Sequence, residues 1–182
     1  MVAMDAKCTL VEIWRDVPGY EGRYEVSDQG RVKSATTKSI MRASVRKNGY
    51  LQVVLSIGGT SKTHLVHRIV WAAFSGSLAA GIHVDHKDRC KTNNAFANLR
   101  AATSSQNNAS RPMKHSGGVR SSVFRGVSRS RNLKRFSASI RIDGVKTHVG
   151  TYRTEESAAL AYDAKAIEVF GEFAVLNFER NQ

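Results

Sequence analysis

One aspartate, one histidine and two asparagines form the group of residues in this sequence that is best suited to chemistry. Asp85 directly precedes His86, and Asn98 and Asn107 follow downstream. Carboxylate and carboxamide oxygens bind hard cations such as Mg²⁺ or Mn²⁺, and an imidazole that titrates near neutrality can take a proton from an attacking water. The set is therefore suited to metal-assisted hydrolysis of a phosphodiester bond.

Each of these residues has a distinct predicted role. Asp85 and Asn107 are candidate metal ligands, His86 is the candidate general base, and Asn98 could orient the imidazole through a side-chain hydrogen bond. Neighbours on a regular strand point to opposite faces, so Asp85 and His86 would need a local bend or bulge to reach one site. The same residues could also be a polar turn, a helix cap and a linker residue.

The nearby histidines and asparagines are competing candidates. His67 lies within an apolar helical pattern and is interpreted as structural, whereas His83 could face the site but receives no role. Asn93 and Asn94 are expected to shape a loop, because asparagine tolerates left-handed backbone geometry. Asn108 could be the metal ligand in place of Asn107 if the position of the ligand along the chain differs by one residue.

Strong basic charge indicates the kind of partner. The formal net charge is +13, the isoelectric point is about 10.2, and the chain contains no Asp or Glu from Arg89 to Ile142. A basic segment without acidic residues has no internal salt bridges to form, which favours phosphate contacts. Double-stranded DNA is the expected partner; a solubilising surface and an RNA-binding role are the alternatives.

Composition excludes several other classes. No apolar run approaches the roughly 20 residues that span a bilayer, and the first residues lack a basic start and an apolar core, so no membrane partner is expected. Cys8 and Cys90 are too few for a disulfide framework. These features predict an intracellular protein without a small-molecule cofactor. The sequence leaves its oligomeric state open, with a monomer favoured.

The segments that must position the candidate site are short. Aromatic and turn residues alternate over 14–32, which predicts short strands. Residues 50–57 and 62–65, separated by a Gly-Gly pair, predict a second strand pair, and 66–74 has apolar residues at helical spacing. A polar, Gly-containing stretch over 111–122 is typical of a linker.

The C-terminal part predicts three strands and one helix. Apolar and polar residues alternate over 136–142, and Asp143-Gly144 favours a two-residue turn into 145–149. This turn would pair Arg141 with Lys146 and Ser139 with His148 on the polar face. The helix should begin after Thr154 as N-cap and end at Gly171.

Three motifs resemble the HNH endonucleases encoded in phage group I introns. They are HLVHRIV (64–70), VDHKD (84–88) and NNAFANLR (93–100), and the segment 14–32 is similar to the N-terminal module of the same enzymes. The resemblance implies a ββα-metal site in which Asp85 and Asn107 bind Mg²⁺ or Mn²⁺. His86 is then the general base, and Asn98 is the residue that positions it.

Residues 123–178 resemble the APETALA-two/ethylene-response-factor domain through FRGV (124–127), FSASIR (136–141), VGTY (149–152), AALAYD (158–163) and LNF (176–178). The family lays a three-stranded sheet in the major groove. Ser128, Leu133, Ser139 and His148 depart from the plant pattern, so the plant target does not carry over. The candidate DNA contacts are Arg125, Arg129, Arg131, Arg135, Ser139, Arg141, Lys146 and His148.

The sequence thus predicts an α+β protein with an N-terminal ββα-metal nuclease domain and a C-terminal three-stranded antiparallel sheet packed on one helix. The expected segments are an N-terminal module (10–35), a nuclease domain (36–110), a linker (111–122) and a DNA-binding domain (123–178). The expected function is that of a sequence-specific, metal-dependent homing endonuclease, which would act in the cytoplasm of a bacterial host if a phage encodes it. The alternative is a DNA-binding regulator with a vestigial nuclease domain.

Overall fold

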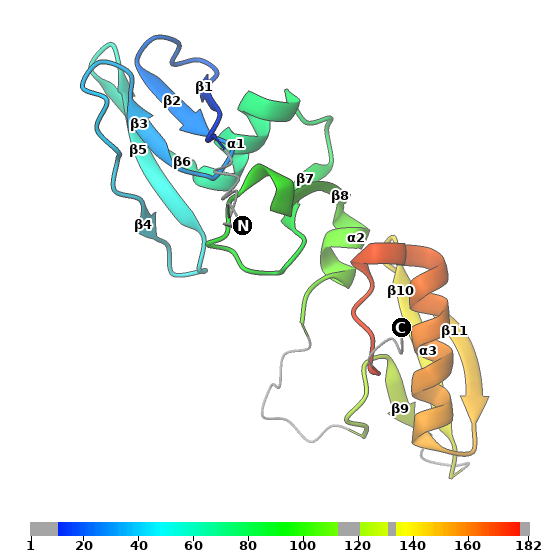
Figure 1. Ribbon diagram of the computed structural model, residues 1–182. Coiled ribbons are helices and arrows are strands. Elements are labelled where there is room, and N and C mark those ends of the chain that lie inside the picture. Colours follow the sequence, from blue (N-terminus) through cyan, green and yellow to red (C-terminus); the bar gives the residue numbers. More distant parts are fainter. Residues whose placement is uncertain (1–10, 113–120, 131–133, 179–182) are drawn as a thin grey trace, which may run out of the picture. The chain divides into compact units, whose positions relative to one another are not determined.

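The computed structural model describes residues 11–112, 121–130 and 134–178 (Figure 1). The chain forms two compact units. The first comprises the chain up to Ala79 together with Val84–Ala101, and the second comprises Ala80–His83 and the chain from Ala102 onward. The boundary therefore falls within the segment 36–110.

Two antiparallel sheets and one helix make up most of the first unit. Strands β1 (Trp14–Asp16), β2 (Tyr24–Ser27) and β3 (Val32–Ser34) form one sheet, and β4 (Ser44–Val45), β5 (Leu51–Ile57) and β6 (Thr60–Leu65) form the other. Gly58 and Gly59 connect β5 to β6 with positive φ angles of 56° and 76°, a conformation that glycine adopts without strain. Helix α1 (Val66–Ser75) follows β6 directly. The predicted strands and helix of this part are confirmed.

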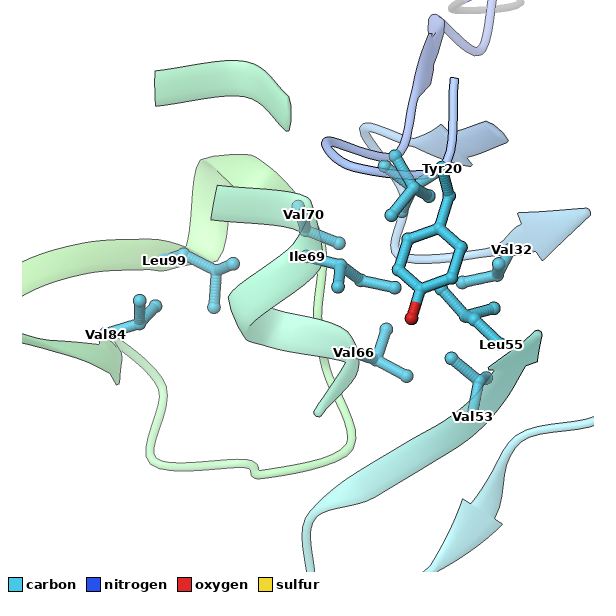
Figure 2. Close-up of a cluster of buried hydrophobic side chains, with 11 residues drawn as sticks. Tyr20, Val32, Val53, Leu55, Val66, Ile69, Val70, Val84 and Leu99 are labelled. Atoms are coloured by element: carbon cyan, nitrogen blue, oxygen red, sulfur yellow. The ribbon is translucent and has the colours of Figure 1, made fainter. Parts of the chain in front are cut away.

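The core of the first unit forms around helix α1. Val66, Ile69 and Val70 are buried at the i, i+3, i+4 spacing of a helix face. Figure 2 shows them between Val53 and Leu55 of strand β5 and the side chains of Val84 and Leu99. Complete burial of each such side chain contributes on the order of 1.5–3 kcal/mol. This packing holds the segment around residue 84 against the helix.

The candidate site lies in the segment that follows. Strand β7 (Ile82–His86) pairs with β8 (Leu99–Thr103), and the loop between them ends in the 3₁₀ helix η1 (Phe96–Asn98). Helix α2 (Ser104–Ala109) begins after Thr103, which accepts from the amide of Gln106 in a capping box. Helix α2 is part of the second unit.

Strands β9 (Val127–Arg129), β10 (Phe136–Ile142) and β11 (Val145–Tyr152) form an antiparallel sheet in the order β11-β10-β9. Helix α3 (Glu155–Phe170) packs on this sheet and is followed by the 3₁₀ helix η2 (Gly171–Phe173) (Figure 1). The buried residues include Ala138 and Ile140 of β10 and Ala158, Tyr162, Ala166 and Phe170 of α3. The predicted three strands and one helix are confirmed, and with them the α+β class.

The predicted register of the last hairpin is also confirmed. Ser139 lies opposite His148, and Arg141 lies opposite Lys146. A bulge that the sequence did not predict lies between Ala138 and Ser139, because Ala138 already pairs with Gly150.

The predicted helix ends are correct as well. Thr154 accepts from the amide of Ser157 at 3.1 Å, and Gly171 follows the helix with a positive φ of 55°. No helix among the described residues is long and apolar enough to cross a membrane.

Candidate active site

His86 ends strand β7 in a buried position. Its side chain shares the buried face of the strand with Val84, and the residue is only 3% exposed. The imidazole lies beside two other rings, with centroid distances of 5.1 Å to His67 and 5.9 Å to Tyr50. Because these rings pack around it, the orientation of His86 is restricted.

One hydrogen bond determines which nitrogen of His86 can act as a base. Nε2 lies 3.0 Å from Oδ1 of Asn94, and Nδ2 of Asn94 donates to the carbonyl of Thr92 at 3.2 Å. The second bond orients the amide, so Oδ1 is the atom that faces His86. Nε2 therefore donates in the neutral ring, and Nδ1 is left with the lone pair that accepts a proton.

Asn98 makes a different set of contacts from the one predicted. Its Nδ2 donates to Oδ1 of Asp88 at 2.9 Å and to the carbonyl of Asn93 at 2.8 Å. Its Oδ1 accepts from the amide of Asp88 at 3.1 Å. These bonds occupy the side-chain amide in closing the loop, so the prediction that Asn98 hydrogen-bonds to His86 is wrong. Asn94, which was predicted only to shape the loop, makes that bond.

Asn94 is itself held by the turn between β2 and β3. Gly30 has a positive φ of 82°, and a Cβ atom built on it would lie 2.7 Å from Cβ of Asn94. The amide of Phe96 donates to the carbonyl of Asp28 in the same turn at 2.7 Å. The sequence carries no signal that separates Asn94 from Asn93, because the difference comes from packing against a segment over 60 residues away in the chain.

Asp85 is flanked on strand β7 by the more buried Val84 and His86. The local bend that would bring Asp85 and His86 to one site stays a prediction. Oδ2 of Asp85 accepts from Nε and Nη2 of Arg100 at 3.1 and 2.9 Å. The two side chains are 12% and 9% exposed. Arg100 thus neutralises and orients a nearly buried carboxylate.

The donor chemistry of Asp85 fits a hard divalent cation, since carboxylate oxygen is the ligand that Mg²⁺ and Mn²⁺ prefer. Nowhere in the described part of the chain do three His, Cys, Asp or Glu side chains gather into a metal centre, so a metal site there would use fewer such ligands. Asn107 is half-buried on helix α2. Asp85 belongs to the first unit and Asn107 to the second, and their joint role stays a prediction.

The two histidines without an assigned role differ in environment. Burial, with smaller contributions from the neighbouring His86 and Arg68, lowers the pKa of His67 to about 4. His67 is therefore neutral at physiological pH, as expected for a structural histidine. His83 lies near helix α2, with Nε2 3.0 Å from Oγ of Ser104.

The predicted DNA contacts divide into groups. Ser139, Arg141, Lys146 and His148 share the face of the sheet opposite Ala138 and Ile140. Arg135 is exposed just before β10. Arg129 is exposed too, but it pairs with Phe136 and so lies on the face that carries the core residues. Arg131 lies outside the described residues, as does most of the predicted linker.

Arg125 is half-buried and bonds within its own unit. Nη1 donates to the carbonyl of Arg111 at 2.8 Å, and Nη2 donates to the carbonyl of Asn108 at 3.3 Å. This environment differs from the open sheet face of Arg141 and Lys146.

Family comparisons match the two halves of the N-terminal region. Residues 12–56 match the NUMOD4 motif, and residues 64–109 match the family described as HNH endonuclease. The second match includes every residue of the predicted site from Asp85 to Asn107. It indicates an HNH endonuclease domain, as the motifs predicted.

Individual relatives agree with these matches. DNA endonuclease I-HmuI of Bacillus phage SP01 is 42% identical over 90 residues, which cover 50% of this chain and 52% of that protein. A solved structure described as "DNA binding and cleavage by the HNH homing endonuclease I-HmuI" has a TM-score of 0.51 and 28% identity, and the match covers 87% of this chain and 91% of that chain. The chain spans about half the length of the curated nuclease it matches.

The C-terminal part is similar to plant proteins. AP2-like ethylene-responsive transcription factor AIL7 of Arabidopsis thaliana is 48% identical over 63 residues, which cover 34% of this chain and 13% of that protein. The match is local, so assignment of an APETALA-two/ethylene-response-factor domain stays a prediction.

Proposed function

We propose that this chain is a metal-dependent DNA endonuclease of the HNH homing type, in which the segment around His86 cuts and the C-terminal sheet holds the DNA. The observation that carries the proposal is the buried imidazole of His86, whose Nε2 is bonded to Asn94 at 3.0 Å within the segment that matches the HNH endonucleases. The similarity to the solved structure of I-HmuI, which is described as one of DNA binding and cleavage, supports DNA as the substrate.

His86 is the proposed general base. With Nε2 donating to Asn94, Nδ1 is the atom that takes the proton from the attacking water. The water oxygen forms the new bond to phosphorus while the bond from phosphorus to the 3′ oxygen breaks, which leaves a 5′ phosphate on the product. The surrounding rings of His67 and Tyr50 restrict rotation of the imidazole, so the base is already oriented when the substrate binds.

Asp85 and Asn107 are the proposed metal ligands. A bound Mg²⁺ or Mn²⁺ would supply the positive charge that stabilises the developing negative charge on the leaving oxygen. Arg100 keeps the Asp85 carboxylate in one orientation through two hydrogen bonds to Oδ2. The metal used is part of the proposal and is open to test.

The C-terminal sheet is proposed to provide the binding surface. Arg141, Lys146 and His148 are exposed on its polar face, where like charges lie side by side and an anion over them would relieve the repulsion. The similarity to plant transcription factors supports a role in holding DNA. Sequence preference would then reside mainly in this sheet.

The test is cleavage of plasmid DNA in the presence of Mg²⁺ or Mn²⁺, with parent protein and the His86→Ala variant compared. Nicked or linear DNA from the parent alone supports the proposal. Specific binding by the parent without cleavage under either metal would instead support the regulator with a vestigial nuclease domain. Preference for RNA over duplex DNA in competition would support the RNA-binding alternative.

A further inference from the structure

Helix α2 packs on the core of the second unit and contacts η2. Ala109, at the end of α2, and Ala102, in the preceding strand β8, both pack with the core cluster that includes residues of β10 and α3. Oγ of Ser105 accepts from the amide of Asp143, in the turn between β10 and β11, at 3.0 Å. The helix is only six residues long, too short to be stable alone. Its position therefore depends on the C-terminal sheet.

Arg125 closes the C-terminal end of this helix. Its two terminal nitrogens donate to the carbonyls of Asn108 and Arg111. Carbonyls at the end of a helix have no partner inside the helix, and a cation there also interacts favourably with the helix dipole. One guanidinium thus binds the last turn of α2 and the residues just beyond it.

The backbone of Arg125 is fixed from the opposite side. Its amide donates to Oδ1 of Asn177 at 2.6 Å, and Nδ2 of Asn177 donates to its carbonyl at 3.2 Å. Asn177 is in turn bonded to the buried carboxylate of Asp163 at 2.9 Å. The next residue, Gly126, leaves no room for a Cβ, which would lie 2.0 Å from the ring of Tyr162. Arg125 is therefore bonded to Asn177, and through it to Asp163 of helix α3, on one side and to α2 on the other.

We propose that Arg125 is a positioning residue that docks helix α2 on the C-terminal sheet and thereby positions Asn107 for cleavage. The inference rests on the proposed function only in that Asn107 is taken as a metal ligand. The C-terminal unit then contributes to the cleavage step as well as to DNA binding. A direct phosphate contact by Arg125, which the resemblance implies, is the competing account.

Arg125→Lys separates the two accounts, because lysine keeps the positive charge but lacks the planar fork that donates to two carbonyls. The matched control is Arg153→Lys, at an exposed arginine of the same unit. Hydrogen exchange is measured on the full chain without DNA or metal. The amide of Ser110, which bonds to the carbonyl of Gln106 at 2.9 Å, should exchange about tenfold faster in Arg125→Lys alone. Equal exchange in parent and variant would overturn the docking role.

Cleavage provides the second measurement. At saturating duplex DNA, Arg125→Lys should lower the single-turnover rate about tenfold while Kd changes less than about twofold. A parental rate, or a change confined to Kd, would contradict the proposal. If the parent does not cleave, the proposed function fails, but the exchange of Ser110 still tests docking.

A second variant distinguishes undocking of α2 from unfolding of the sheet. Ser105→Ala removes a contact of α2 without changing the sheet, and should also accelerate exchange of Ser110, by a smaller factor. Amides of β10 and β11 should stay protected in both variants. If the amides of β10 lose protection in Arg125→Lys, that variant has lost part of its fold, and the Ser105→Ala variant becomes the test. In that case, an unchanged exchange rate of the Ser110 amide in Ser105→Ala overturns the proposal.

Discussion

The two units place polar residues in opposite environments. In the first unit His86 and Asn94 are each 3% exposed and are bonded to one another. In the second unit Arg141, Lys146 and His148 stand on an exposed sheet face. A proton-transfer group must be held in one orientation, whereas a surface that binds a long polyanion must be open. The comparison suggests that chemistry depends on local burial and DNA binding depends on exposed charge.

The largest expected effect is structural and confined to the second unit. Gly126→Ala would place a Cβ atom 2.0 Å from the ring of Tyr162, at a residue with a positive φ of 74°. We expect a loss of roughly 4 kcal/mol or more in the stability of this unit. Thermal unfolding should show a lower Tm for the sheet. The matched control, Gly144→Ala, also has a positive φ but no atom within 4 Å of the added Cβ, and should cost less.

Acid should destabilise the first unit through His67. Its pKa is about 4 in the folded chain and near 6.5 when unfolded, so the unfolded chain binds the proton first as the pH falls. The contribution of neutral His67 to the free energy of unfolding is therefore fully present above pH 6.5, and up to about 3 kcal/mol of stability is lost as the pH falls from 6.5 to 4. Denaturant unfolding against pH measures this loss. A His67→Phe variant should have a flatter profile, and an unchanged slope would show that another group is responsible.

Removing the partner of His86 should slow cleavage without affecting DNA binding. Asn94→Ala leaves Nε2 of His86 without its acceptor, so we expect the single-turnover rate to fall about 10–100-fold. Asn93→Ala is the neighbouring control, because Asn93 bonds to Asp88 rather than to His86. Equal losses in the two variants would mean that the loop as a whole, and not the bond to His86, supports the site.

The smallest expected effect is on the exposed sheet. Arg141→Gln should weaken DNA binding by about 1 kcal/mol and reduce the slope of log Kd against log salt by about one. The saturated cleavage rate should stay at the parental value. Binding titrations at several salt concentrations measure both quantities. A reduced cleavage rate would contradict the view that this exposed sheet face serves binding alone.

The C-terminal sheet and helix could be predicted because their signals are local. Alternation over β10, the Asp143-Gly144 turn and the Thr154 cap lie within a few residues of the structure they determine. The bulge after Ala138 carries no such signal. Local patterns therefore recovered the element order but not every irregularity.

The details of the site depended on distant packing. Asn94 rather than Asn98 meets His86 because Gly30, in a turn far along the chain, packs against Asn94. The side chain of Arg125 bonds to the end of α2, and its backbone is fixed by Asn177 and by the close packing of Gly126. Single-residue chemistry identified His86 and Asp85 as candidates, but it did not identify their partners.

The central claim is that His86 is the base of a DNA-cleaving site. The most direct measurement compares parent and His86→Ala in one assay of duplex DNA, with binding and single-turnover cleavage recorded in Mg²⁺ and in Mn²⁺. The account predicts that His86→Ala retains parental Kd and loses cleavage by about 10²–10⁴-fold. Equal cleavage by the parent and the variant would contradict it.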